Sequence, residues 1–312
     1  MTEPNPIIKN LRESTGIRIA ILFGSFFVFL LFCSVAGYLI NNAPGSERSH
    51  LLIMSSLQCI LAFCLPAVLV AKFSNNDWIK WLEIDRKPKI KSFLGIIVLY
   101  IISLPAMEWL IEWNSSLHLP ESMSGIESQL RAWEESAEST TQMLLDSHGW
   151  LSVLVGVCVI GILTGFSEEL FFRGGLQGIF TRSAINKNAA VWMAAMIFSL
   201  MHFQFFGFLP RLLMGAFFGY LLLWTRSIWV PAFAHILNNS IVVISSYLTG
   251  NSEDSILELN EMPTFLNGSV SACISLILTI LFFIYLRDIL FKTSKEEEKG
   301  WQRSQLPVST ER

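Results

Sequence analysis

The chain has 312 residues, of which 52% are hydrophobic and only 15% are charged. Soluble domains carry about 25% charged residues, so this composition excludes an ordinary soluble globular protein. A mean hydropathy of +0.51, together with 24 Phe and 10 Trp residues, excludes intrinsic disorder. A net charge of -3 offers no basis for binding nucleic acid. Residence in a lipid bilayer is the class that remains.

Apolar runs near the length needed to cross a bilayer recur along the chain. A hydrocarbon core about 30 Å thick requires roughly 20 apolar residues per helix. Runs of about this length lie at residues 19–40, 51–71, 94–111, 149–170, 188–206, 212–224, 228–248 and 268–286. The sixth is short, so its helix has to extend past Arg211 or the bilayer has to thin. The sequence predicts an all-α, polytopic membrane helix bundle with about eight transmembrane helices.

The distribution of Lys and Arg predicts the orientation of these helices. Short cytoplasmic loops carry an excess of basic residues. With a cytoplasmic N-terminus, 19 of the 22 basic residues fall on the inner side, and only Arg48, Arg131 and Arg211 fall on the outer side. Both termini are therefore predicted to be cytoplasmic. Because no transit peptide is recognisable, we expect a multi-pass protein of the bacterial cytoplasmic (plasma) membrane.

Two of the predicted outer segments are acidic, at residues 112–148 and 249–267. Within the first, apolar residues recur at spacings of three and four residues, which is typical of an amphipathic helix. They are Met123, Ile126, Leu130, Trp133 and Ala137. We expect this helix to lie on the outer membrane surface or on the bundle, and a lid over a site is the alternative.

Polar side chains occur in the interiors of three predicted spans. They are Glu168, Glu169 and Arg173 at the end of the fourth, His202 in the fifth, and His235 and Asn239 in the seventh. Ionisable groups inside a bilayer are costly, so they are usually paired, line a polar cavity or take part in chemistry. These residues are therefore the candidates for a functional site.

Helical spacing suggests how these groups are arranged. Glu169 and Arg173 are four residues apart with the acid first, the favourable order for an ion pair. Glu168 points about 100° away on an α-helix and lacks that partner, so it is the candidate general base. His235 and Asn239 are also four residues apart, so both can donate hydrogen bonds to a single oxygen.

Each of these groups also has an interpretation without catalysis. Glu169 and Arg173 could form only a membrane-edge ion pair, and His202 only an interhelical hydrogen bond. Asn239 could contribute only polar contacts between helices. The combination of a carboxylate, two imidazoles and a carboxamide on three helices instead favours water activation and oxyanion binding.

Three short motifs follow one another along the chain, each on a predicted helix. They are Glu168-Glu169-x-x-x-Arg173, Phe198-x-x-x-His202 and His235-x-x-x-Asn239. In this order they resemble the CAAX protease and bacteriocin-processing family of intramembrane endopeptidases, also called Abi proteins. The resemblance covers roughly residues 150–245, and in such a protein Arg173 would order Glu169 and the helix end.

The resemblance implies a role for each remaining polar residue. Glu168 would be the general base and His202 its partner in activating water. His235 and Asn239 would stabilise the tetrahedral oxyanion. The expected reaction is hydrolysis of a peptide bond near the cytoplasmic leaflet, and the expected partners are the bilayer and a membrane-associated or lipidated protein or peptide substrate. No nucleic acid is expected.

The resemblance also suggests how the chain is divided. Residues 1–148 would contain three transmembrane helices and the acidic outer segment, for which no relationship is recognisable. Residues 149–290 would form the catalytic membrane core. Residues 291–312 would form a charged cytoplasmic tail.

The sequence leaves the participation of a metal open. Glu168, His202 and His235 would make an acceptable zinc set with an open fourth position. None of the five histidines is followed by Glu, so the H-E-x-x-H motif is absent. Metal-free water activation with no cofactor is therefore the preferred interpretation, and a zinc-dependent protease is the alternative.

Two functions from other classes are also considered. An ion-coupled transporter would use the Glu, His and Arg side chains as a proton or ion path. It is disfavoured because no inverted repeat is detectable and the polar residues cluster at one level. The other is a non-catalytic membrane protein that acts in immunity or as a scaffold.

Overall fold

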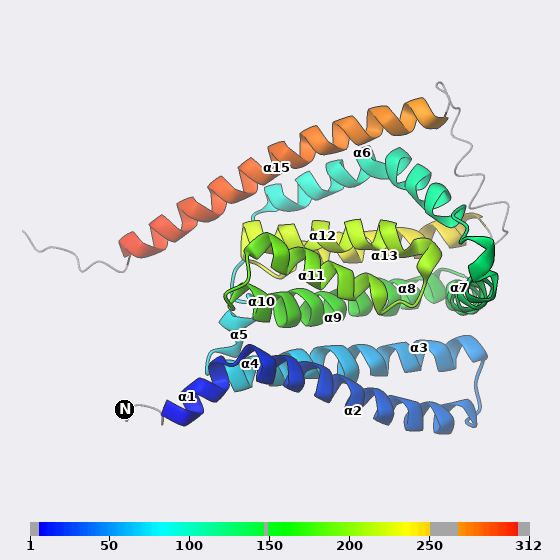
Figure 1. The fold of residues 1–312 in the computed structure, drawn as a ribbon, viewed down its shortest axis with the longest axis horizontal. Helices are drawn as coiled ribbons and strands as arrows, with labels where there is room; N and C mark the ends of the chain where they lie inside the picture. Colours follow the sequence, from blue (N-terminus) through cyan, green and yellow to red (C-terminus); the bar gives the residue numbers. More distant parts are fainter. Residues whose placement is uncertain (1–5, 147–148, 250–267, 305–312) are drawn as a thin grey trace, which may run out of the picture.

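The computed structural model describes residues 6–146, 149–249 and 268–304, and no strand occurs in this part of the chain. The long helices run side by side along the bundle, up and down (Figure 1). The predicted all-helical membrane class is therefore confirmed.

Six of the described helical stretches are long and apolar enough to cross a membrane, so the protein is an integral, multi-pass membrane protein. They are Thr15–Asn41, Glu47–Ser74, Ile90–Ser115, Trp150–Thr181, Phe205–Thr225 and Gly268–Leu290. The sixth predicted run belongs to this set, because helix α12 (Phe208–Thr225) extends past Arg211. The fifth and seventh runs correspond to α11 (Lys187–Leu200) and α13 (Trp229–Thr249). A total of eight crossings and the cytoplasmic location of the termini stay predictions.

The N-terminal helices form a layer along one side of the bundle (blue in Figure 1). They are α1 (Pro6–Glu13), α2 (Thr15–Asn41), α3 (Glu47–Leu57), the π-helical segment η1 (Gln58–Cys64), α4 (Leu65–Ser74) and the short α5 (Trp78–Trp81). On the opposite side, α6 (Ile90–Ser115) lies against α15 (Gly268–Ser304). The start of α1 and the end of α15 lie at the same end of the bundle, as an even number of crossings requires.

The central layer is built from one long helical stretch together with α11, α12 and α13 (Figure 1). The long stretch comprises α8 (Trp150–Gly156), η3 (Val157–Thr164), α9 (Gly165–Glu169), η4 (Leu170–Gln177) and α10 (Gly178–Thr181). Both η3 and η4 are π-helical and flank the α-helical turn that carries the two glutamates. Such π-helical insertions recur at functional sites because they change the rotation of the side chains that follow.

The helix boundaries differ from the expected ones in three places. The fourth span runs to Thr181 rather than ending near residue 170, so Arg173 lies inside the helix and not in an inner loop. The fifth helix ends at Leu200, so His202 lies in the turn that follows. Helix α15 continues through Ser304 into the expected tail. Residues 305–312 of that tail and residues 250–267 of the second acidic segment lie outside the described residues.

The amphipathic helix expected around residues 123–137 is present as α7 (Ser124–Leu145), preceded by the 3-10 turn η2 (Glu121–Met123). It lies across one end of the bundle and is seen end-on in Figure 1. It contacts α3, α13 and the turn η5 (Phe205–Gly207), so it docks on the bundle.

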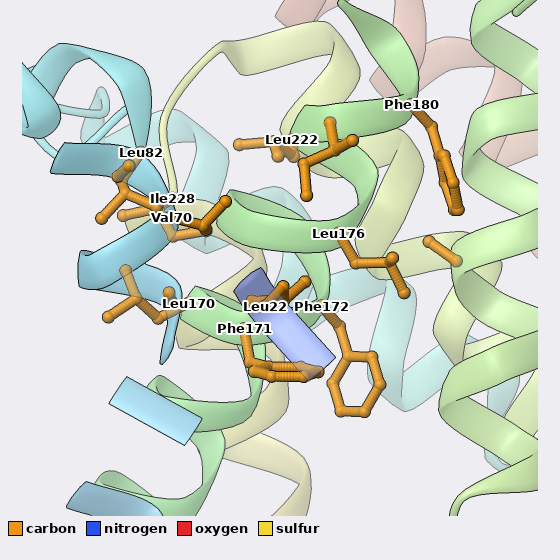
Figure 2. Close-up of a cluster of buried hydrophobic side chains, with 14 of the residues drawn as sticks. Leu22, Val70, Leu82, Leu170, Phe171, Phe172, Leu176, Phe180, Leu222 and Ile228 are labelled. Carbon is orange, nitrogen blue, oxygen red and sulfur yellow. The ribbon is translucent and has the colours of Figure 1, made fainter. Parts of the chain in front are cut away.

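A cluster of apolar side chains packs η4 against its neighbours (Figure 2). Leu170, Phe171, Phe172 and Leu176 of η4 meet side chains from the N-terminal layer and from α12. Those partners include Leu22, Phe26, Val70, Leu82 and Leu222. In a bilayer, close van der Waals packing rather than exclusion of water holds helices together. This cluster therefore fixes the helix that carries the two glutamates.

A glycine allows two helices to approach each other closely beside the glutamates. A Cβ atom on Gly165 would lie 3.0 Å from the backbone nitrogen of Ile236 and 3.2 Å from its Cα atom. Because both neighbouring atoms belong to the backbone of α13, the contact cannot be relieved by a side-chain rotation. Gly165 thus sets the distance between α9 and α13.

Substitution Gly165→Ala should lower the free energy of unfolding by about 1–3 kcal/mol, the usual cost of overpacking. Thermal unfolding of the purified protein in detergent measures the change. Gly24→Ala in α2 is the matched control, because nothing lies within 4 Å of the added methyl group. It should be neutral or stabilising by up to about 1 kcal/mol, since Ala favours helix more than Gly. Equal effects of the two substitutions would contradict the close-approach argument.

Candidate active site

The carboxylate of Glu169 is the centre of the polar cluster. Its side chain is 0% exposed, and its Oε1 atom accepts two hydrogen bonds. One comes from Nη1 of Arg173 at 2.8 Å, and the other comes from Nδ1 of His235 at 2.8 Å. Its Oε2 atom has no hydrogen-bond partner within the described residues. The expected pairing with Arg173 is therefore present. The contact with His235, which belongs to the seventh predicted span, was not expected.

Arg173 is enclosed by the helix bundle and does not lie at its edge. Its side chain is 1% exposed, and Nη2 donates to the carbonyl oxygen of Gly215 at 2.9 Å. The guanidinium also lies over the rings of Phe198 and Phe218, at 4.5 and 5.2 Å from their centroids. Because burial of an ion without partners is costly, these contacts explain how a cation persists in the apolar interior. The alternative of a solvent-exposed, membrane-edge ion pair does not fit this burial.

The contact with Glu169 determines the orientation of the His235 ring. A carboxylate oxygen only accepts hydrogen bonds here, so Nδ1 of His235 carries the proton and Nε2 is directed elsewhere. Nε2 lies 3.8 Å from Oε2 of Glu168, whose side chain is 14% exposed. The ring also stacks on Phe218 at a centroid distance of 4.9 Å. The two glutamates therefore lie at opposite nitrogens of one imidazole.

His202 lies beside this group but is connected to it differently. Its Nδ1 atom is 2.8 Å from the carbonyl oxygen of Phe198, so Nδ1 donates and Nε2 keeps the lone pair. The Phe198 ring is edge-on to His202 at 4.9 Å and to His235 at 6.0 Å. Within the described residues, no hydrogen bond joins His202 to Glu168. Phe198 is thus the spacer that sets the separation of the two histidines.

Asn239 lies one turn beyond His235 on the same helix. Its Nδ2 atom donates to the carbonyl oxygen of Ile160 in η3 at 3.1 Å, and its Oδ1 atom accepts from Asn238 at 3.2 Å. These contacts hold the carboxamide in one orientation and leave one of its two Nδ2 hydrogens without an assigned acceptor. Asn239 therefore links α13 to η3 rather than contacting Glu168 directly.

Some polar residues of this cluster were not identified from the sequence. One is Gln177, which is 1% exposed and donates from Nε2 to the carbonyl oxygen of Gly219 at 2.9 Å. This contact repeats the bond from Arg173 to Gly215 one helical turn further on. Gln177 follows Arg173 by four residues, and Gly219 follows Gly215 by four residues, so the matched spacings were a signal for two facing helices.

The zinc alternative involves Glu168, His202 and His235. Among the described residues, no three His, Cys, Asp or Glu side chains are grouped as metal ligands. Nδ1 of His235 is engaged by Glu169, and Nδ1 of His202 is engaged by the main chain. Neither contact engages Nε2 of these rings, so zinc participation stays an alternative prediction, and we route no step of the chemistry through a metal.

Comparison with known proteins agrees with the position of this cluster. Residues 150–241 match the family described as type II CAAX prenyl endopeptidase, Rce1-like. We call residues 150–241 the Rce1-like segment because they are similar to that family. The resemblance inferred from the three motifs is thereby confirmed, and every residue of the polar cluster lies within the Rce1-like segment. The match supports an intramembrane protease of the CAAX type with a protein substrate. Among curated proteins and among solved structures, nothing matches the chain.

Removing the buried cation should strongly destabilise the protein. Arg173→Ala leaves Glu169 without its cation in an apolar interior, and such losses cost about 3–5 kcal/mol. Adding Glu169→Gln should recover part of this loss, because no uncompensated charge then remains. Chemical unfolding in detergent measures each variant. Arg287→Ala is the control, since its pair with Asp288 is half-exposed and should contribute little. Wild-type stability of Arg173→Ala would show that the ion pair does not hold the site together.

Proposed function

We propose that the protein is an integral membrane endopeptidase that hydrolyses a peptide bond of a membrane-associated or lipidated substrate near the cytoplasmic leaflet. The observation that carries this proposal is the placement of His235 between two carboxylates inside the Rce1-like segment. Glu169 orients the ring through Nδ1 at 2.8 Å, and Glu168 lies 3.8 Å from Nε2. A carboxylate beside an imidazole that can donate to a developing oxyanion suits a general base placed next to an oxyanion site.

In the proposed reaction, Glu168 is the general base. It removes a proton from a water molecule as the water oxygen bonds to the scissile carbonyl carbon, and a tetrahedral oxyanion forms. The proton then passes from Glu168 to the amide nitrogen, and the carbon–nitrogen bond breaks to release an amine and a carboxylate. His202, with its Nε2 lone pair available, accepts a hydrogen bond from the same water and holds it in line.

The proposed oxyanion site consists of His235 and Asn239, four residues apart on α13. To donate from Nε2, His235 has to carry a second proton, and the carboxylate of Glu169 faces the positive charge that this proton creates. Asn239 would use its second Nδ2 hydrogen, because the first is held by Ile160. Donors held in place before the reaction stabilise the transition state without a cost of reorganisation.

Two substitutions test these assignments. Glu168→Gln should lower turnover by at least 10²-fold, the scale of general base catalysis. Asn239→Ala should lower turnover by about 10²- to 10³-fold, the usual cost of losing one oxyanion donor. Both variants should fold normally. Cleavage of a prenylated peptide reporter with a CAAX terminus in proteoliposomes measures the rates.

Glu108→Gln removes a carboxylate from α6 and serves as the control, with wild-type turnover expected. A Glu168→Gln variant that cleaves as fast as wild type would refute its assignment as the base. A Glu168→Gln variant that fails to cleave but still complements a deletion strain would favour a scaffold or immunity role. Ion flux into proteoliposomes that Glu168→Gln abolishes, without proteolysis, would favour a transporter.

We further propose that water activation is metal-free. Exhaustive chelation should leave turnover unchanged. The metal content of the pure protein is measured alongside. Stoichiometric zinc that is lost together with activity, and restored together with it, would instead support the zinc-dependent alternative. Wild-type protein carried through the same procedure without chelator provides the control for simple inactivation.

A further inference from the structure

His202 belongs to an irregular segment, residues 201–207, between α11 and α12. The turn after Leu200 includes Phe203 in the left-handed region, with φ at 54°. Because the segment contains only a turn and the single 3-10 turn η5, its position is not determined by the repeating hydrogen bonds of an α-helix. The location of the imidazole therefore depends on its hydrogen bond to the Phe198 carbonyl of α11 and on what holds this segment from outside.

Side chains from four surrounding helices satisfy the main-chain groups in and beside this segment. Irregular backbone at the end of a membrane bundle requires such partners, since main-chain groups left unpaired are costly. The four side chains are Asn114 of α6, Glu134 of α7, Ser199 of α11 and Arg211 of α12. Asn114 is 2% exposed and bridges two points, donating to the Phe205 carbonyl at 3.3 Å and accepting from the Leu209 N–H at 2.8 Å.

Helix α7 supplies two contacts to this segment. Oε2 of Glu134 accepts a hydrogen bond from the main-chain N–H of Phe206 at 3.1 Å. The guanidinium of Arg131 lies over the Phe206 ring, 4.0 Å from its centroid. Together they hold the main chain and the side chain of a residue four positions after His202.

Glu134 also acts on the segment through a second residue. Its Oε1 atom lies 3.9 Å from Nη2 of Arg211. Arg211 in turn donates to the side chain of Gln204 at 2.7 Å and to its carbonyl oxygen at 3.1 Å. The segment is therefore held at residues 204 and 206 by one connected group of charges that ends on α7.

Helix α7 is itself fixed at its first turns. Oε1 of Glu127 accepts from Nε of Arg131 at 3.0 Å, and Oε2 accepts from the main-chain N–H of Leu119 at 2.9 Å. Hydrogen bonds from His118, Leu119 and Arg131 lower the pKa of Glu127 to about 2. The carboxylate thus stays charged across the physiological range, and Arg131 is held facing Phe206.

We propose that Glu134 is a positioning residue for His202 and that α7 has a role in catalysis through this contact. The proposal rests on the proposed function, in which His202 holds the attacking water. Glu134 does not touch substrate; it fixes the main chain that carries the imidazole. A displacement of about 1 Å in a reacting group costs up to roughly 10²-fold in rate, so loosening this segment should be visible in turnover.

Glu134→Ala should lower kcat by about 10-fold and leave KM within twofold, because substrate binding does not depend on the position of the water-holding ring. In Glu134→Gln, the side-chain amide oxygen can still accept a hydrogen bond from the Phe206 N–H. This variant should therefore recover most of the lost turnover. Glu135→Ala removes the neighbouring, exposed carboxylate of the same helix and is the control. It should behave as wild type. Glu134→Ala should unfold at a slightly lower temperature because the Phe206 N–H loses its acceptor, whereas Glu134→Gln and Glu135→Ala should unfold at the wild-type temperature.

A double-mutant cycle with His202→Ala separates positioning from a direct effect. If Glu134 acts through His202, Glu134→Ala should reduce the residual turnover of the His202→Ala protein no further. An equal reduction in both backgrounds would overturn the proposal, and so would wild-type kcat for Glu134→Ala. Unfolding of Glu134→Ala at a lower temperature, with a parallel loss in Glu134→Gln, would show a structural role only.

The position of the ring can also be measured without catalysis. In protein labelled with carbon-13 at histidine, the Cε1–H resonance of His202, assigned with His202→Ala, should shift or broaden in Glu134→Ala. It should not change in Glu135→Ala, and the resonance of His235 should not change in either. Wild-type turnover of His202→Ala would refute the proposed function, and the resonances would still decide whether Glu134 positions the ring. An unchanged His202 resonance in Glu134→Ala would overturn the inference.

Discussion

A single carboxylate oxygen that binds both Arg173 and His235 is the interaction on which the central layer depends. Oε1 of Glu169 accepts from both at 2.8 Å, deep inside an apolar bundle. An isolated charge at this position would be costly, so the carboxylate and the guanidinium require each other. Because the carboxylate of Glu169 and the guanidinium of Arg173 neutralise each other's charge, the fourth span can continue as a helix to Thr181. The same carboxylate attaches α13 to α9 through the imidazole.

Close helix approach makes this interaction geometrically available. Gly165 brings the backbone of α13 against α9, and Gly215 exposes a carbonyl oxygen to Arg173. The ring of Phe198 lies edge-on to both histidines and separates them, and the ring of Phe218 stacks on His235. The site therefore combines small residues where backbones meet with large rings where side chains must be held apart. This division explains why an otherwise apolar bundle contains a polar cluster.

The part of the chain that precedes the Rce1-like segment contributes to the site in two ways. The N-terminal layer packs on η4 and fixes the helix that carries the glutamates (Figure 2). Asn114 of α6 and the amphipathic helix α7 hold the irregular segment that carries His202. The family match covers only residues 150–241, yet the geometry inside that match depends on contacts from outside it.

Local spacing by itself determined the membrane class, six of the spans, the amphipathic helix and the Glu169–Arg173 pair, because all of these depend on neighbours along one helix. Only the tertiary structure decided that Glu169 meets His235, 66 residues away, and that Glu134 holds Phe206, 72 residues away. The π-helical segments η3 and η4 also change side-chain rotation around the glutamates, which a 3.6-residue period does not describe. His202 lies in a turn rather than in the expected helix, and side chains of α6, α7 and α12 hold the residues that follow it. Such contacts between helices are not encoded in any local repeat.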